Sequence, residues 1–76
     1  MLNVIKAKYI EDFKILVEFD NHIKKEIDFT EYLKNEKRPI FHYMKKVDNF
    51  RLFEIINNTV CWNNDIDIAP EFLFEM

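Results

Sequence analysis

The side chains that most often do chemistry are few in this sequence and lie far apart in it. The two histidines, His22 and His42, and the single cysteine, Cys61, have no spacing that matches a zinc site. Cys61 lies in an apolar stretch without a cationic neighbour in sequence, which favours a buried, inert thiol over a nucleophile. The chain contains no serine and no glycine, so serine hydrolase chemistry is excluded and a glycine-rich phosphate loop is disfavoured. We therefore expect no metal, no cofactor and no catalytic residue, and the chain is not expected to be an enzyme.

The run Asn63-x-Asp65-x-Asp67 carries the oxygen ligands with which a calcium loop begins. Its sixth position is Ile68, where such a loop needs glycine, and its twelfth is Phe74, where the loop needs a bidentate glutamate. The run is therefore better explained as a turn followed by the cap of a helix.

The residues around this run predict a strand that passes through a polar turn into a short helix. Val60 and Trp62 are expected on one face of the strand, because side chains two residues apart share a face. Asp67 precedes Pro70 at a spacing that suits an N-cap, with proline in the first turn of the helix. We expect a structural motif formed by Trp62, Asp67, Pro70 and Glu71.

Residues 37–46 combine basic and aromatic side chains. The basic residues are Lys37, Arg38, Lys45 and Lys46, and Phe41, His42 and Tyr43 lie between them. Such a set can stack a single-stranded base and neutralise phosphates. The other interpretation is that the rings belong to the core and the bases flank them in solvent, which the net charge of −3 favours. A nucleic-acid-binding or regulatory module that uses segment 37–46 is the alternative hypothesis, and nucleic acid is not the expected partner.

The acidic residues concentrate toward the C-terminus. Residues 52–76 contain five acidic side chains and no basic one, whereas residues 24–51 contain eight basic and five acidic ones. This asymmetry is compatible with a basic protein partner, although charge of this size also serves solubility. We expect the partner to be bound through Glu54, Glu71 and Glu75.

Length and composition indicate one small domain, residues 1–76, with a dense core. A chain of 76 residues buries only part of its unfolded surface, so eight Phe, three Tyr and one Trp must supply much of the burial. One cysteine cannot form an internal disulfide, and no apolar run near 18 residues or signal-peptide pattern is present. A soluble cytoplasmic protein without a membrane segment is expected.

Alternating side chains predict the strands. Phe13, Ile15, Val17 and Phe19 alternate with mostly polar residues, a period of two that indicates a strand with one buried face. Residues 2–10 and 23–29 are expected as its neighbours in an antiparallel meander, and residues 52–56 and 59–62 as a C-terminal hairpin. We predict an α+β fold: a mostly antiparallel sheet, built from the β-meander and the hairpin, with short helices covering one face.

Caps and turn residues predict the connections. Asp28 and Glu31 have the spacing of a capping box for a helix through Leu33, and Asp48 is expected to cap another helical turn. Residues 40–44 are expected to form a turn that covers the sheet. Without glycine, positive φ angles must fall on Asn, Asp or His. The turn positions expected to use them are Asn21, Asn57, Asn58, Asn63 and Asn64.

Five stretches of the chain resemble a known family. The first is the hairpin that runs from residues 19–21 to residues 27–29. The others are residues 39–41, Phe50, Trp62 and residues 67–71. Together they resemble the small bacterial family called domain of unknown function 2442. In that family the tryptophan is typically followed by a Pro-Asn-Gly-type turn. Here Asn63, Asn64 and Asp65 occupy the turn, and His22 stands where a hairpin glycine is usual.

The resemblance implies an α+β domain without an established enzymatic activity. Some members look like antitoxin-like partners encoded beside a small toxin-like protein, and others are fused to helix-turn-helix domains. We therefore expect a non-enzymatic small protein-interaction domain, the antitoxin-like partner of a basic or toxin-like bacterial protein. Whether it is a monomer or a homodimer is left open by the sequence.

Overall fold

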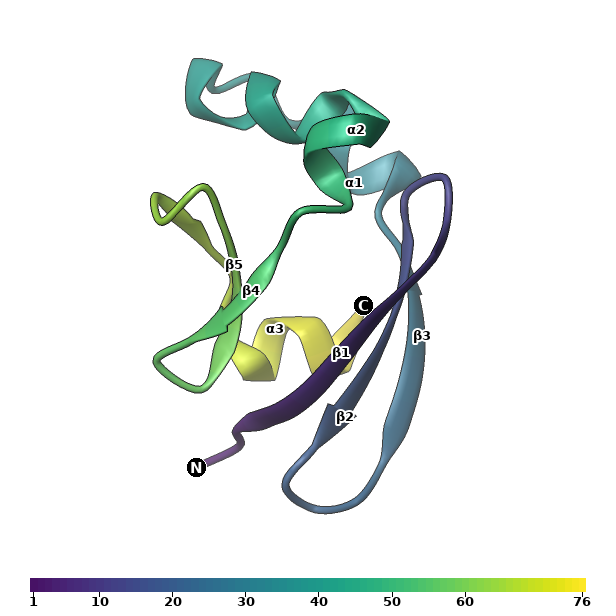
Figure 1. The fold of residues 1–76 in the computed structure, drawn as a ribbon, viewed down its shortest axis with the longest axis vertical. Coiled ribbons are helices and arrows are strands. Elements are labelled where there is room, and N and C mark those ends of the chain that lie inside the picture. The colour runs from purple at the N-terminus through teal and green to yellow at the C-terminus, as the bar shows by residue number, and fades with distance from the viewer.

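The computed structural model describes all 76 residues and contains two small antiparallel sheets with short helices (Figure 1). The strands are β1 (Val4–Glu11), β2 (Lys14–Phe19), β3 (Lys24–Asp28), β4 (Glu54–Ile56), β5 (Thr59–Trp62) and β6 (Ile66–Asp67). The helices are α1 (Thr30–Asn35), the 3-10 helix η1 (Pro39–Lys45), α2 (Val47–Phe50) and α3 (Pro70–Glu75). The predicted α+β class is confirmed. None of these helices is long and apolar enough to cross a membrane.

The first sheet is the predicted meander, in the order β1-β2-β3. Ile15, Val17 and Phe19 are fully buried, while the residues between them are partly exposed. Ile15 pairs with Ile27 across the β2–β3 ladder, so the buried faces of the two strands coincide. The period-two pattern therefore predicted the buried face of β2 correctly, although Phe13 lies in the turn before the strand and is only partly buried.

The second sheet has the order β4-β5-β6 and is separate from the first, so the meander and the hairpin do not join into the one sheet that the sequence predicted. The predicted hairpin is present, although its first strand starts at Glu54, and β6 is an additional strand that the sequence pattern did not predict. All four residues of β5 are buried. The Val4 N–H donates to the Asn58 carbonyl at 2.8 Å, so the start of β1 lies against the β4–β5 turn. The strands thus form two sheets that meet at this point.

The turns use non-glycine residues at positive φ. Four of the five predicted residues have positive φ: Asn57, Asn58, Asn63 and Asn64. In the β2–β3 turn the prediction was wrong by one position, because His22 has φ 68°. Asn21 instead accepts a hydrogen bond from the Ile23 N–H at 3.1 Å. This bond is the side-chain turn that asparagine forms without a left-handed backbone.

Two predicted helix caps are wrong. Asp67 lies in β6, where it pairs with Cys61, and α3 starts after Ala69, which makes no side-chain cap bond. Asp48 lies inside the first turn of α2, which starts at Val47. The capping box predicted at Asp28 and Glu31 is only half formed: Asp28 accepts hydrogen bonds from the Thr30 N–H at 2.9 Å and the Thr30 hydroxyl at 2.6 Å, but Phe29 is the N-cap of α1 and Glu31 makes no bond back to Asp28. Pairing with a neighbouring strand decided the place of Asp67, and a short-range pattern does not contain that information.

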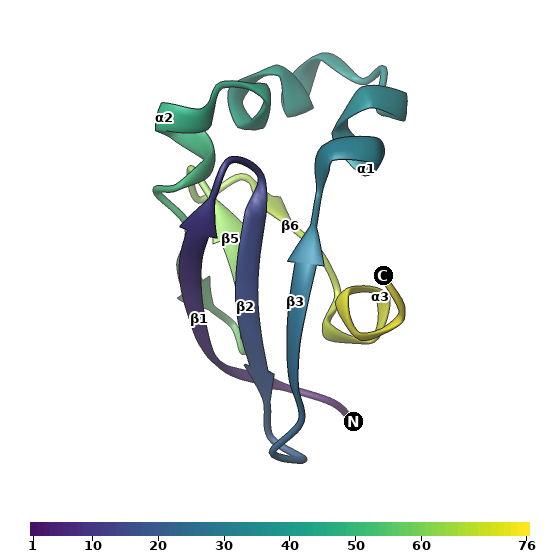
Figure 2. The same cartoon turned by 90° about the vertical axis from the view of Figure 1, so that its right-hand side faces the viewer.

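The core joins both sheets and all four helices. Trp62 is fully buried, and its indole N–H donates to the Phe50 carbonyl at 2.8 Å. In Figures 1 and 2, α1, η1 and α2 gather at one end of the molecule, and α3 lies beside β3. The Lys25 ammonium group on β3 donates to the carbonyl of Phe74 and, at 3.2 Å, to that of Met76. These bonds hold α3 against the first sheet.

Candidate binding groove

A groove of about 440 Å³ lies between segments that are distant in sequence. One wall comes from α1 and η1, and the other from β6 and the start of α3. Its lining residues are Tyr32, Glu36, Arg38, Phe41, Asp67, Ile68, Ala69 and Phe72. A second hollow of about 170 Å³ shares Arg38, Phe41 and Asp67 with it and adds Ile40, Asp65 and Ile66. We call these two hollows together the β6 groove.

Aromatic rings form much of the apolar surface of the β6 groove. The Tyr32 ring packs edge-to-face against Phe41 and Phe72, with centroid distances of 6.0 and 5.8 Å. Phe72 and Ile40 are each 50% exposed, whereas Phe41 is buried. Burial raises the pKa of the Tyr32 hydroxyl, and the nearby Glu36 charge adds to this effect. The groove thus offers uncovered apolar surface that already has a fixed shape.

The charged side chains of the β6 groove do not balance. Arg38 forms a two-pronged pair with Glu36, with distances of 2.9 Å from Nε to Oε1 and 2.8 Å from Nη2 to Oε2. Hydrogen bonds from Arg38 lower the pKa of Glu36 to about 2, so this pair stays ionised and neutral as a unit. Asp65 and Asp67 take part in neither of the two ion pairs of the chain. The groove therefore carries two uncompensated negative charges.

Cys61 lies on β5, the strand next to β6, and is not suited to nucleophilic chemistry. Its side chain is buried, and it faces Asp67 across the β5–β6 ladder. Burial raises the pKa of the Cys61 thiol, and the negative charge of Asp67 raises it further. A neutral thiol is a weak nucleophile and a poor metal ligand. No three His, Cys, Asp or Glu side chains come close enough together to hold a metal ion.

The three glutamates expected to bind a partner lie on two different elements. Glu54 is exposed on β4, the strand at the opposite edge of the second sheet from β6. Glu71 and Glu75 lie one helical turn apart on α3, and both are exposed. The Glu71 carboxylate accepts a hydrogen bond from the Leu2 N–H at 3.1 Å. Only the two α3 residues flank Phe72, and Glu54 is not brought to the β6 groove.

The basic segment 37–46 is also divided by the fold. Lys37 and Lys46 are exposed. Arg38 is paired with Glu36 in the β6 groove, and its guanidinium carbon lies 4.7 Å from the Phe41 ring centroid. Phe41 is only 6% exposed, so its ring is not free to stack on a base. The interpretation of the rings as core is therefore the better one for Phe41.

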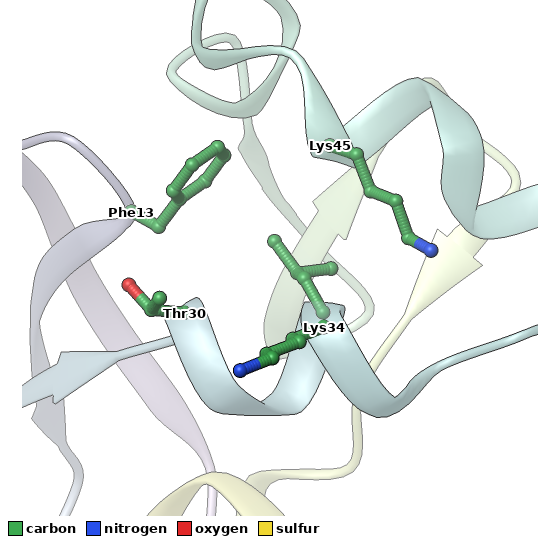
Figure 3. A pocket seen from close by; sticks show the side chains of 5 residues that line it. Phe13, Thr30, Lys34 and Lys45 are labelled. Carbon is green, nitrogen blue, oxygen red and sulfur yellow. The ribbon is translucent and has the colours of Figure 1, made fainter.

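Lys45 lines a separate pocket of about 210 Å³ with Lys34 (Figure 3). The apolar surface of this pocket comes from Phe13 and Leu33, and Thr30 completes the lining. The ammonium groups of the two lysines lie on opposite sides of the pocket. That of Lys45 donates to the Glu36 carbonyl at 2.7 Å. The two charges do not converge on one point where a phosphate could sit.

Sequence reasoning missed the groove because its walls are brought together only by folding. Tyr32 and Phe72 are 40 positions apart, and each looks like an ordinary apolar residue of a short helix. The sequence places Asp65 in the turn after Trp62 and among the acidic side chains of the C-terminal third, and neither pattern indicates a groove. The one available signal was the surplus of acidic side chains between residues 52 and 76, and it indicated the sign of the charge without its place.

No curated protein and no solved structure matches the chain. A family model does match residues 4–75, which is nearly the whole chain, and it is described as "Protein of unknown function (DUF2442)". The match includes both sheets and the whole β6 groove, and it agrees with the resemblance found in the residues around Trp62. The chain belongs to the DUF2442 family.

Proposed function

We propose that this chain is a small, non-enzymatic protein-interaction domain that binds a basic partner protein through the β6 groove. The observation that carries the proposal is the combination, in one groove, of exposed apolar side chains and carboxylates without a cationic partner. Phe72 and Ile40 supply the exposed apolar surface, and Asp65 and Asp67 supply the charge. The groove's volume, about 440 Å³, is within the range of about 300–1,000 Å³ that is usual for binding pockets.

Each of these two features has a physical role in binding a protein. Aromatic side chains in partly formed pockets are the residues that most often dominate the binding energy of protein interfaces. Negative charge beside them speeds association with a basic surface and disfavours acidic partners. Glu71 and Glu75 on α3 extend the negative charge beyond the groove. A basic protein with an apolar side chain at its contact surface fits both features.

The family supplies the biological part of the proposal. The resemblance described above implies antitoxin-like members that pair with a small toxin-like protein. We propose the same role here, in the bacterial cytoplasm, with the toxin-like protein as the basic partner.

Co-purification from the native host, followed by binding measurements with the identified protein, tests this proposal. Phe72→Ala removes exposed apolar surface, and Glu75→Lys reverses a charge on the same helix. We expect both to weaken binding, and we expect wild-type binding to weaken with added salt. Glu26→Lys is the matched control, since Glu26 is exposed on β3 and lines neither hollow of the groove.

The opposite pattern would favour the alternative function. In that case the chain would shift single-stranded nucleic acid, the shift would disappear in Lys37→Glu and Lys45→Glu, and no protein would co-purify. A partner that binds Phe72→Ala and Glu75→Lys as tightly as the wild type would also refute the role of the groove.

A further inference from the structure

We propose that the partner binds by adding an extended, basic segment to the free edge of β6. This inference rests on the proposed function and specifies its binding mode. The segment would lie in the β6 groove, with lysine or arginine side chains alternating with aliphatic ones.

The backbone of β6 is open on one side. β6 is the edge strand of the second sheet, and its only strand partner is β5, through the pairs Cys61–Asp67 and Trp62–Ile66. The chain stays extended after β6, since Ala69 has φ −56° and ψ 139°. No backbone hydrogen bond connects residues 66–68 with α1 or η1 across the groove. An edge of this kind can accept a further strand.

The side chains around this edge specify the chemistry of the added segment. Successive side chains of a strand point to opposite faces, so an added segment presents two different sets of side chains. One set can meet the carboxylates of Asp65 and Asp67, which have no cationic partner. The other can cover the rings of Tyr32 and Phe72. Arg38 does not oppose a basic segment, because Glu36 already neutralises its charge.

The same charges disfavour a second copy of the chain as the occupant. Two β6 strands that paired antiparallel would bring the Asp65 and Asp67 carboxylates of both copies close together. Like charges placed opposite one another across strands are destabilising. A nucleic acid strand would meet the same repulsion from its phosphates.

A short synthetic peptide, acetyl-Lys-Val-Lys-Val-Lys-amide, tests the proposal in an NMR titration of the full chain. We expect amide shifts that centre on residues 66–69 and extend to Ile40 and Phe41, with slower hydrogen exchange at the β6 edge. Asp67→Asn should weaken binding about two- to fivefold, the effect of losing one exposed charge pair. Asp67 caps no helix and forms no ion pair, so this variant should keep its stability. Asp48→Asn, an exposed aspartate on α2, is the matched control and should bind normally.

A peptide with the same sequence but with the backbone nitrogen of its central lysine methylated separates strand addition from charge attraction alone. Methylation removes a backbone N–H and keeps every charge, so we expect binding to be lost. Equal binding of the methylated peptide overturns strand addition, while the partner's dependence on Phe72 would still support the proposed function. Shifts confined to Phe13, Leu33 and Lys34, or no shift at millimolar peptide, also overturn the inference. So would a dimer that perturbs the β6 amides without peptide.

Discussion

Replacing Trp62 by phenylalanine separates the hydrogen bond of this side chain from its packing. Trp62 is fully buried, and its N–H donates to the Phe50 carbonyl at 2.8 Å. Its ring lies 5.5 and 5.6 Å from the ring centroids of Phe29 and Phe50, which a phenyl ring can still approach. The variant therefore keeps an aromatic ring in the core and removes the donor.

The expected loss is a large part of the total stability. A buried carbonyl that loses its donor costs about 1–3 kcal/mol. The smaller ring also leaves unfilled space, which we put at about 1–2 kcal/mol, below the roughly 3–5 kcal/mol of truncation to alanine. The sum is about 2–5 kcal/mol, against a total of about 4–11 kcal/mol for a domain of this length. We expect Tm to fall by at least about 10 °C.

Urea unfolding followed by far-ultraviolet circular dichroism measures this loss, because the variant has no tryptophan fluorescence. The matched control is Phe53→Leu. Phe53 is partly buried, and its ring centroid lies 6.1 Å from that of Trp62, so the control removes a ring contact and keeps the hydrogen bond. We expect the control to lose about 1 kcal/mol. If Trp62→Phe loses no more than Phe53→Leu, with an unchanged m-value, the bond to Phe50 contributes nothing and the reasoning is wrong.

Two further predictions concern α3 and the rim of the β6 groove. Lys25→Met removes the ammonium donor to the last carbonyls of α3, so the α3 amides should exchange faster while the β2 amides keep their protection. Lys24 is an exposed neighbour, and Lys24→Met should leave the exchange rates of both elements unchanged. Equal α3 exchange rates in the two variants would refute the anchoring role of Lys25. Hydrogen bonds from Arg38 lower the pKa of Glu36 from 4.5 to about 2, so the folded state favours the ionised carboxylate. The stability from this pair is complete above about pH 4.5 and is lost as the pH falls toward about 2. The Tm difference between the wild type and Glu36→Gln should therefore be present at neutral pH and vanish at the acidic end, and a difference independent of pH would contradict this assignment.

Local patterns in the sequence predicted the parts of the fold that depend on neighbouring residues. The alternation in β2 identified its buried face, and Asn57, Asn58, Asn63 and Asn64 marked turns that need a positive φ. The conformation at each of these positions depends mainly on the residue itself and on those beside it. Such information is present in any short window of the sequence.

Contacts between distant residues decided what the sequence did not reveal. Asp67 has the spacing of a helix cap, but pairing with Cys61 places it in β6, and α3 starts without its help. The β6 groove exists because the rings of Tyr32 and Phe72 come into contact, and the sequence around either residue does not indicate this contact. The charge of the groove was predictable in sign from the acidic C-terminal third. The position of that charge was not predictable, because the positive charge of Arg38 is neutralised by Glu36 only in the folded chain.

The fastening of α3 at both ends has a consequence for how the molecule opens. Glu71 at its first turn accepts from the Leu2 N–H, and Lys25 on β3 holds its last carbonyls. The two sheets share one cluster of 15 buried residues, and a sheet of three short strands has little stability without such a cover. Neither half can therefore unfold and leave the other intact, so the domain should open as one cooperative unit. A ligand that occupies the β6 groove then protects every strand from proteolysis and hydrogen exchange, including those it never touches.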